Sequence, residues 1–132
     1  MTKKKMFIAA LAVSGLLIGC HKGDNPVQPP PTPKPLELLY PKGGESLKVG
    51  VTVAVQWRIN DSTKISSVAA KLSTNNGITY DFQIFTRSLP PDTLFLPWTI
   101  TVGQVSTQCK IKIYEYNDPS INDQSGTFTV HN

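Results

Sequence analysis

The sequence predicts an all-β domain, and two observations point to that class. From residue 36 to residue 132, apolar and polar residues alternate with a period of two in several short runs, as in strands that bury one face. Clusters of Pro, Gly, Asn and Asp separate the runs, and no window shows the 3.6-residue period of an amphipathic helix. About seven such strands predict an antiparallel β-sandwich, with a small closed barrel as the alternative.

The first half of this domain contains the strictest alternation. Residues 36–40 are predicted as a short first strand, which ends at Pro41 and Gly43-Gly44. In residues 51–59 every second side chain is apolar, and Trp57 belongs to this set. A slip of one residue would move the whole set to the other face, so we predict a central strand that buries Trp57.

A hairpin and three further strands follow. Residues 68–72 and 78–84 alternate on either side of Asn76-Gly77, a pattern typical of a β-hairpin because both residues tolerate positive φ. The remaining strands are predicted at residues 94–98, 109–113 and 128–130. Pro97 lacks a backbone N–H, so the first of these three strands is expected at a sheet edge or a bulge.

The first 20 residues predict an exported chain that is processed. Three lysines, Lys3 to Lys5, precede an apolar run at residues 6–18. A helix needs about 20 apolar residues to cross a bilayer, so this shorter run is typical of a secretion signal.

The signal ends in Leu17-Ile18-Gly19-Cys20, which resembles the lipobox of bacterial lipoproteins. The resemblance implies that a diacylglycerol is attached to the Cys20 thiol and that residues 1–19 are removed as a signal peptide. It also implies that the new amino terminus is acylated, for example with palmitate. Two or more acyl chains hold a protein stably in a membrane. We therefore expect a lipid-anchored protein of the bacterial cell envelope.

Residues 20–35 predict a tether between the lipid and the domain at residues 36–132. Six of the chain's eleven prolines lie here. They prevent helix and sheet and favour an extended polyproline-II form of about 3.1 Å per residue. We interpret the segment as a semi-rigid spacer, with a proline-rich ligand for another domain as the alternative. Lys22, in place of Asp at the second position after the cysteine, favours the outer membrane over the inner membrane.

The charge balance gives no support to a nucleic-acid partner. The chain has 13 Lys and Arg against 9 Asp and Glu, but loss of the three signal lysines leaves 10 against 9. A nucleic-acid partner would need a clustered basic face, and none is expected. With Cys20 lipidated, Cys109 has no disulfide partner in the chain, and its alternation with Ile111 predicts a buried thiol.

The order of turn and core residues resembles that of one known family. The residues that carry the resemblance are Pro41-Lys42-Gly43-Gly44-Glu45, Gly50, Trp57, Leu72-Ser73, Gly77, Trp98, Ile111-Lys112-Ile113, Ser125 and Phe128. The pattern is similar to that of the Ser/Thr-rich GPI-anchored membrane family, whose domains are immunoglobulin-like and also occur as modules in bacterial envelope proteins. The resemblance implies a disulfide-free sandwich of immunoglobulin or fibronectin-III type that brings no catalytic residues.

The sequence predicts no enzyme and no cofactor. Nucleophilic catalysis needs a nucleophile with a base in reach, and the two histidines are His21, in the tether, and His131, beside the last residue. A zinc site needs about four ligands at suitable spacing, which the sequence does not offer. A hydrolase of unknown type is the remaining enzymatic alternative.

One loop is a candidate calcium site. Its oxygen-bearing side chains are Asn117, Asp118, Asn122 and Asp123. Their spacing matches no EF-hand, and a solvated turn explains the same residue types.

Four aromatic residues are candidate surface contacts for a ligand, because they fall out of phase with the apolar faces or at strand ends. They are Tyr40, Phe85, Tyr114 and Tyr116. Trp57 and Trp98 are assigned to the core instead. We expect a membrane-anchored lipoprotein with a non-catalytic binding or structural module that contacts envelope glycan or a protein partner. An accessory subunit of an envelope enzyme or secretion complex is the alternative.

Overall fold

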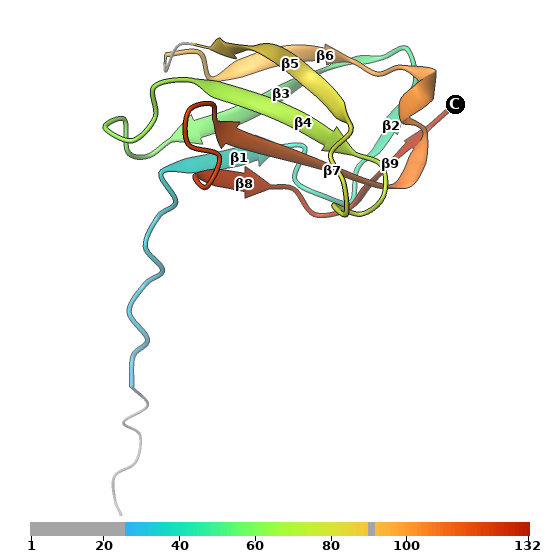
Figure 1. Cartoon of the computed structure of the whole chain (residues 1–132). Coiled ribbons are helices and arrows are strands. Elements are labelled where there is room, and N and C mark those ends of the chain that lie inside the picture. Colours follow the sequence, from blue (N-terminus) through green and yellow to red (C-terminus); the bar gives the residue numbers. More distant parts are fainter. Residues whose placement is uncertain (1–25, 90–91) are drawn as a thin grey trace, which may run out of the picture. The chain divides into compact units, whose positions relative to one another are not determined.

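The computed structural model describes residues 26–89 and 92–132, with side chains for 26–85 and 92–132 (Figure 1). The predictions on Leu17, Ile18, Gly19 and Cys20 lie outside the described residues. Residues 26–34 are extended and solvent-exposed, without secondary structure. The strands belong to one compact unit, Pro33–Asn132.

The described residues contain nine strands and one 3-10 turn, η2 at Val102–Gln104. The strands are β1 (Leu36–Tyr40), β2 (Ser46–Lys48), β3 (Thr52–Ile59), β4 (Val68–Ser73), β5 (Phe82–Leu89), β6 (Phe95–Thr99), β7 (Ser106–Glu115), β8 (Asn122–Gln124) and β9 (Phe128–His131). The count exceeds the predicted seven because β2 and β8 have three residues each, too few to show an alternation.

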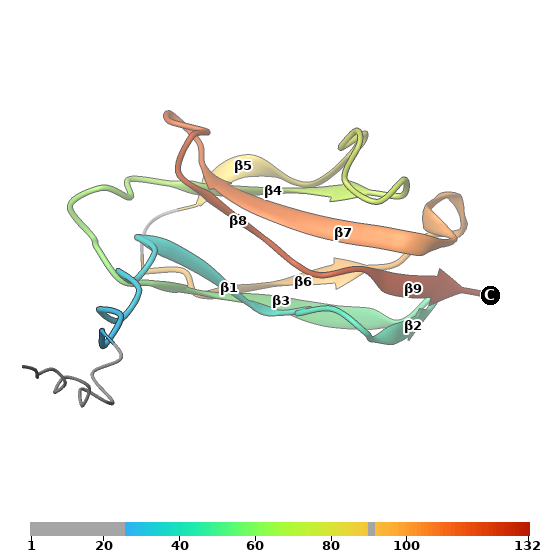
Figure 2. The same cartoon turned by 90° about the horizontal axis from the view of Figure 1, so that it is seen from below.

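The strands form two sheets that face each other as the layers of a β-sandwich (Figure 2). The smaller sheet has the order β1-β3-β6, and the larger has the order β2-β9-β7-β4-β5 with β8 beside β7. The predictions of a strand at residues 36–40, of a central strand at residues 51–59 (observed as β3) and of an edge position for the strand with Pro97 are confirmed. The prediction that all strands pair antiparallel is wrong, because β2 runs parallel to β9.

The turn between β1 and β2 explains part of the sequence motif at residues 41–45. Gly43 has a φ of +127°, and a Cβ there would lie 2.8 Å from the Cα of Gly126. The Glu45 carboxylate accepts hydrogen bonds from the backbone N–H groups of Lys42 (2.7 Å) and Gly43 (2.8 Å). Glycine and glutamate are therefore needed for the turn itself.

The hairpin prediction is confirmed for β4 and β5, but the second strand begins later than expected. Asn76 and Gly77 have φ values of +62° and +85°. Strand β5 starts at Phe82 rather than residue 78, because residues 74–81 form a loop with its own hydrogen bonds. Within this loop the Asn75 side-chain oxygen accepts from the backbone N–H of Thr79 at 2.9 Å.

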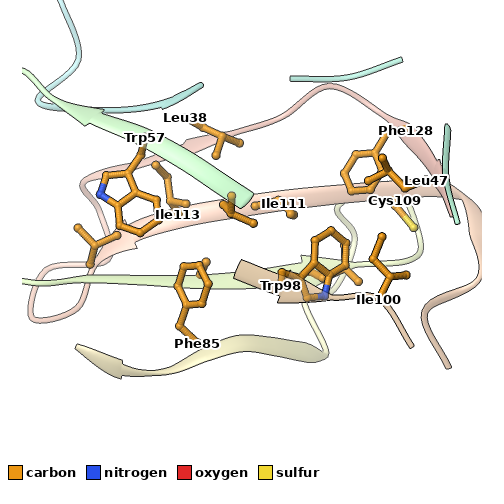
Figure 3. Close-up of a cluster of buried hydrophobic side chains, with 14 of the residues drawn as sticks. Leu38, Leu47, Trp57, Phe85, Trp98, Ile100, Cys109, Ile111, Ile113 and Phe128 are labelled. Atoms are coloured by element: carbon orange, nitrogen blue, oxygen red, sulfur yellow. The ribbon is translucent and has the colours of Figure 1, made fainter. Parts of the chain in front are cut away.

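The core lies between the two sheets and contains two aromatic pairs (Figure 3). Trp57 is 1% exposed and packs on Phe85 with ring centroids 5.7 Å apart. Trp98 packs edge-on against Phe128 at 6.4 Å. The predicted burial of both tryptophans is confirmed, as is that of Cys109, whose thiol is free and buried.

Candidate functional site

The two faces of β7 differ in chemistry. Ile111 and Ile113 point into the core and are fully buried. Lys110, Lys112 and Tyr114 alternate with them and therefore lie on the outer face of the larger sheet. This outer face is the candidate functional surface.

A polar row crosses four strands on this face. Pairing places Gln83 of β5 opposite Lys71 of β4, Lys71 opposite Lys112 of β7, and Lys112 opposite Gln124 of β8. Directly opposite residues have Cβ atoms about 4.5–5.5 Å apart. Lys71 and Lys112 are therefore neighbours across the sheet, and the side-chain amides of Gln83 and Gln124 flank them.

Three tyrosines complete a depression of about 330 Å³ next to the two lysines. We call it the tyrosine–lysine pocket, and it is lined by Lys71, Tyr80, Lys112, Tyr114, Tyr116 and Pro119. Its volume lies at the lower end of the range usual for small-ligand sites, about 300–1,000 Å³.

Each lysine of the pocket is held over a tyrosine ring. The Lys112 Nζ lies 4.8 Å from the ring centroid of Tyr80, and the Lys71 Nζ lies 5.7 Å from that of Tyr114. Both distances are within the roughly 6 Å over which a cation is attracted by a ring face. The Tyr80 hydroxyl is also 2.7 Å from the side-chain oxygen of Gln124, to which it donates. The ammonium groups are therefore positioned before any ligand arrives.

The phenols stay protonated over a wide pH range. Burial raises the pKa of Tyr80. Burial, and then the neighbouring Tyr116, raises the pKa of Tyr114. The Tyr114 hydroxyl therefore keeps a proton to donate, whereas that of Tyr80 is directed to Gln124, and the half-exposed ring of Tyr116 offers a face for stacking.

The four predicted aromatic contacts separate into three groups. Tyr114 and Tyr116 line the pocket, while Tyr40 ends β1 and does not. Phe85 is only 3% exposed, so the prediction that it lies on the surface is wrong. The pairing shifts between Ala70–Phe85 and Lys71–Gln83, which leaves Ile84 as an extra residue. Such a bulge reverses the inward and outward alternation and turns Phe85 into the core.

Sequence reasoning missed Tyr80 and both pocket lysines. The alternation of residues 78–84 assigned Tyr80 to a strand, whereas it lies in the loop before β5. The useful signal was present in β7, where Lys112 and Tyr114 share a face opposite to Ile111 and Ile113.

The candidate calcium ligands do not converge. The buried Asp123 carboxylate bonds Lys34 and accepts the Leu38 backbone N–H at 2.8 Å. The Asp118 carboxylate accepts from the Ser120 hydroxyl at 2.6 Å. The Asn117 side-chain amide donates to the Glu115 carboxylate at the end of β7, and that of Asn122 donates to the backbone oxygen of Pro119. In the described part of the chain, no three Asp, Glu, His or Cys side chains form a metal-binding group. The contacts agree with the alternative interpretation, a turn stabilised by hydrogen bonds among its own residues and their neighbours.

Glu115 is a buried carboxylate that the sequence did not single out. It accepts hydrogen bonds from the backbone N–H groups of Ser66 (2.7 Å), Ser67 (3.0 Å) and Asn117 (3.0 Å). Burial alone would raise the pKa of Glu115, but these bonds and that from the Ser66 hydroxyl outweigh it and lower the pKa from 4.5 to about 2. Glu115 ties the end of β7 to the segment before β4, a structural role.

The outer face of the smaller sheet holds a second depression, of about 490 Å³. We call it the apolar groove, and it is lined by Leu39, Ala54, Gln56, Trp57, Leu94 and Phe95. Phe95 is 60% exposed and Leu94 is 50% exposed. The two outer faces of the sandwich therefore offer different chemistry.

No protein-family model matches the chain, and searches among curated proteins and among solved structures find no match either. Over the described residues, no helix combines the length and the apolar character needed to span a membrane.

Proposed function

We propose that this protein is a lipid-anchored binding module of the bacterial cell envelope, held by its lipid in the outer membrane, and that its ligand is envelope glycan. The observation that carries the proposal is the tyrosine–lysine pocket. Its rings can stack on sugars, and its phenol and ammonium groups can hydrogen-bond to sugar oxygens. We assign no catalytic step to it.

The fold identity is part of the proposal. Two packed layers, a central β3 and a free buried Cys109 support a disulfide-free sandwich of immunoglobulin or fibronectin-III type. The motif resemblance to the Ser/Thr-rich GPI-anchored membrane family supports the same assignment, since its Gly-Gly-Glu element forms the turn after β1.

Anchoring rests on the lipobox and has its own test. Cys20→Ala removes the thiol that would carry the diacylglycerol, so we expect an unprocessed precursor without lipid. Growth with a radioactive fatty acid followed by electrophoresis checks this. Label that persists in the variant would overturn the anchoring proposal.

Glycan binding is tested with full-length lipidated protein in detergent micelles and insoluble peptidoglycan sacculi. We expect sedimentation with the sacculi, and we expect Tyr116→Ala to reduce the bound fraction severalfold because the exposed ring is lost. Tyr40→Ala is the matched control, since Tyr40 lies outside the pocket and should bind as the wild type does. Equal binding by the two variants would contradict the assignment of the pocket.

The apolar groove supports a second candidate function, that of an accessory subunit. Phe95 and Leu94 expose ring and methyl groups that an apolar segment of an envelope protein could cover. A photo-crosslinker at position 95 should then capture one partner, whereas a crosslinker at position 116 should not.

A further inference from the structure

The inference concerns the charge of the ligand and rests on the proposed function. We infer that the tyrosine–lysine pocket is built for an acidic glycan, in which sugar rings carry carboxylate or phosphate groups, rather than for a neutral one. A neutral sugar would not require the lysines of this pocket.

Lys71 and Lys112 stand directly opposite each other across the β4–β7 pair. Lys110 lies two residues along β7 on the same face, opposite Ser73. Like charges directly opposite each other destabilise a sheet. The pairing of Lys71 with Lys112 therefore disfavours the free domain, and an anion bound beside the two ammonium groups would reduce the repulsion.

Protection of a sheet edge does not explain these lysines. Lysine often guards exposed edge strands against pairing with other chains. Strands β4 and β7 are interior strands, because β5 lies beyond β4, and β9 and β8 lie beyond β7. The lysines thus occupy the centre of the sheet, where a bound ligand would rest.

The neighbours of the lysines supply no balancing charge. The residues that pair with Lys71 and Lys112 on the outer strands are the neutral Gln83 and Gln124. The ion pairs of the described residues involve Lys34, Lys42, Arg58 and Lys64. Within the described part of the chain, the three outer-face lysines form no ion pair.

The nearby carboxylates are engaged elsewhere. Glu115 is directed to Ser66 and Ser67, and Asp123 to Leu38 and Lys34. Asp81 accepts from the Thr79 hydroxyl at 2.6 Å. The pocket therefore presents two ammonium groups together with the hydroxyls of Tyr114 and Tyr116, which suits a ligand with carboxylate and hydroxyl oxygens.

The test uses full-length lipidated protein in detergent micelles and calorimetric titration with three probes. The probes are hexagalacturonate, neutral cellohexaose of the same length, and polyglutamate, which carries charge without sugar. We expect hexagalacturonate to bind at least tenfold more tightly than either of the others, with an affinity that falls as salt is added.

The variant Lys71→Met/Lys112→Met should bind hexagalacturonate and cellohexaose equally. Because it removes a repulsive pair, it should unfold at the same temperature as the wild type or a higher one, which shows that the domain is intact. The matched control Lys48→Met/Lys64→Met changes two exposed lysines outside the pocket and should keep the acidic preference.

Three outcomes overturn the inference. Equal affinity for the acidic and neutral sugars would reject the charge preference while leaving glycan binding in place. Polyglutamate binding as tight as that of hexagalacturonate would reject the glycan and leave a pocket for charge alone. Failure of both sugars to bind, together with failure to sediment with sacculi, would reject the proposed function as well.

Discussion

The inner and outer faces of strand β7 differ in how far packing explains their residues. On the inner face, Ile111 and Ile113 are fully buried in the core that holds Trp57. On the outer face, Lys112 lies directly opposite Lys71, a placement that repulsion disfavours. Residues on the inner face are explained by packing alone. The outer face contains an arrangement that packing does not explain, and we attribute it to a ligand.

The outer face of the smaller sheet differs from that of the larger sheet. It exposes Phe95 and Leu94, and its charged residues Glu37 and Arg58 are paired with each other. A change to the inner faces should therefore alter stability, and a change to the outer faces should alter binding with little effect on stability.

The largest effect is expected for Trp57→Ala. Truncation of a buried aromatic side chain costs about 3–5 kcal/mol of unfolding free energy, a large share of the roughly 5–15 kcal/mol that stabilises a domain. Urea unfolding followed by circular dichroism measures it. Tyr116→Ala, on the outer face, is the control and should stay within about 0.5 kcal/mol of the wild type. Similar losses in both variants would remove the distinction between the faces.

The next largest loss of unfolding free energy is expected for Glu115→Gln, and this loss should depend on pH. The carboxylate has a pKa near 2 in the folded protein against 4.5 unfolded, a difference that corresponds to about 3 kcal/mol. A lowered pKa stabilises the fold fully above pH 4.5, and this contribution is lost as the pH falls toward 2. The variant should therefore differ most from the wild type near pH 7 and least near pH 2.

Unfolding midpoints between pH 2 and pH 7 test this prediction. Glu37→Gln is the control, because Glu37 pairs with Arg58 at the surface and should matter much less. A constant difference between Glu115→Gln and the wild type at every pH would contradict the proposed cause.

Asp123→Ala should have an intermediate effect. It leaves the buried N–H of Leu38 without its acceptor, which costs about 1–3 kcal/mol. Asp123→Asn keeps an acceptor oxygen and should lose less. A chelator should not change the unfolding midpoint of the wild type, whereas a clear decrease would restore the calcium interpretation of this loop.

The smallest effect is expected for Phe95→Gln. The ring is more than half exposed, so the unfolding free energy should change by no more than about 0.5 kcal/mol. The diagnostic measurement is the crosslinked partner at the apolar groove, which the variant should lose. A large drop in stability would show that Phe95 serves the fold.

The sequence predicted the fold class and most strands because periodicity reports burial directly. It placed Trp57, Trp98 and Cys109 in the core for that reason. It placed Phe85 wrongly because a bulge at Ile84 changes the phase, and bulges leave no mark in an alternating pattern. Two of the three pocket tyrosines, Tyr114 and Tyr116, were found, but the pairing of Lys71 with Lys112 depends on the register between β4 and β7. That register joins residues about 40 positions apart, and local sequence patterns do not fix it.

The attachment of the tether to the domain has a mechanical consequence. The backbone oxygen of Pro35 accepts the Asn60 N–H at 2.8 Å, and Asp123 of β8 binds both Lys34 and the Leu38 N–H. If the chain is held at Cys20, tension on the tether would load β1 through the backbone and, through these bonds, also β8. The next residue of β8, Gln124, holds Tyr80 in the pocket. Tension on the anchor would therefore act on β8, whose Gln124 holds Tyr80 at the proposed binding pocket. Stretching of the tether and binding of a ligand would then affect the same strand.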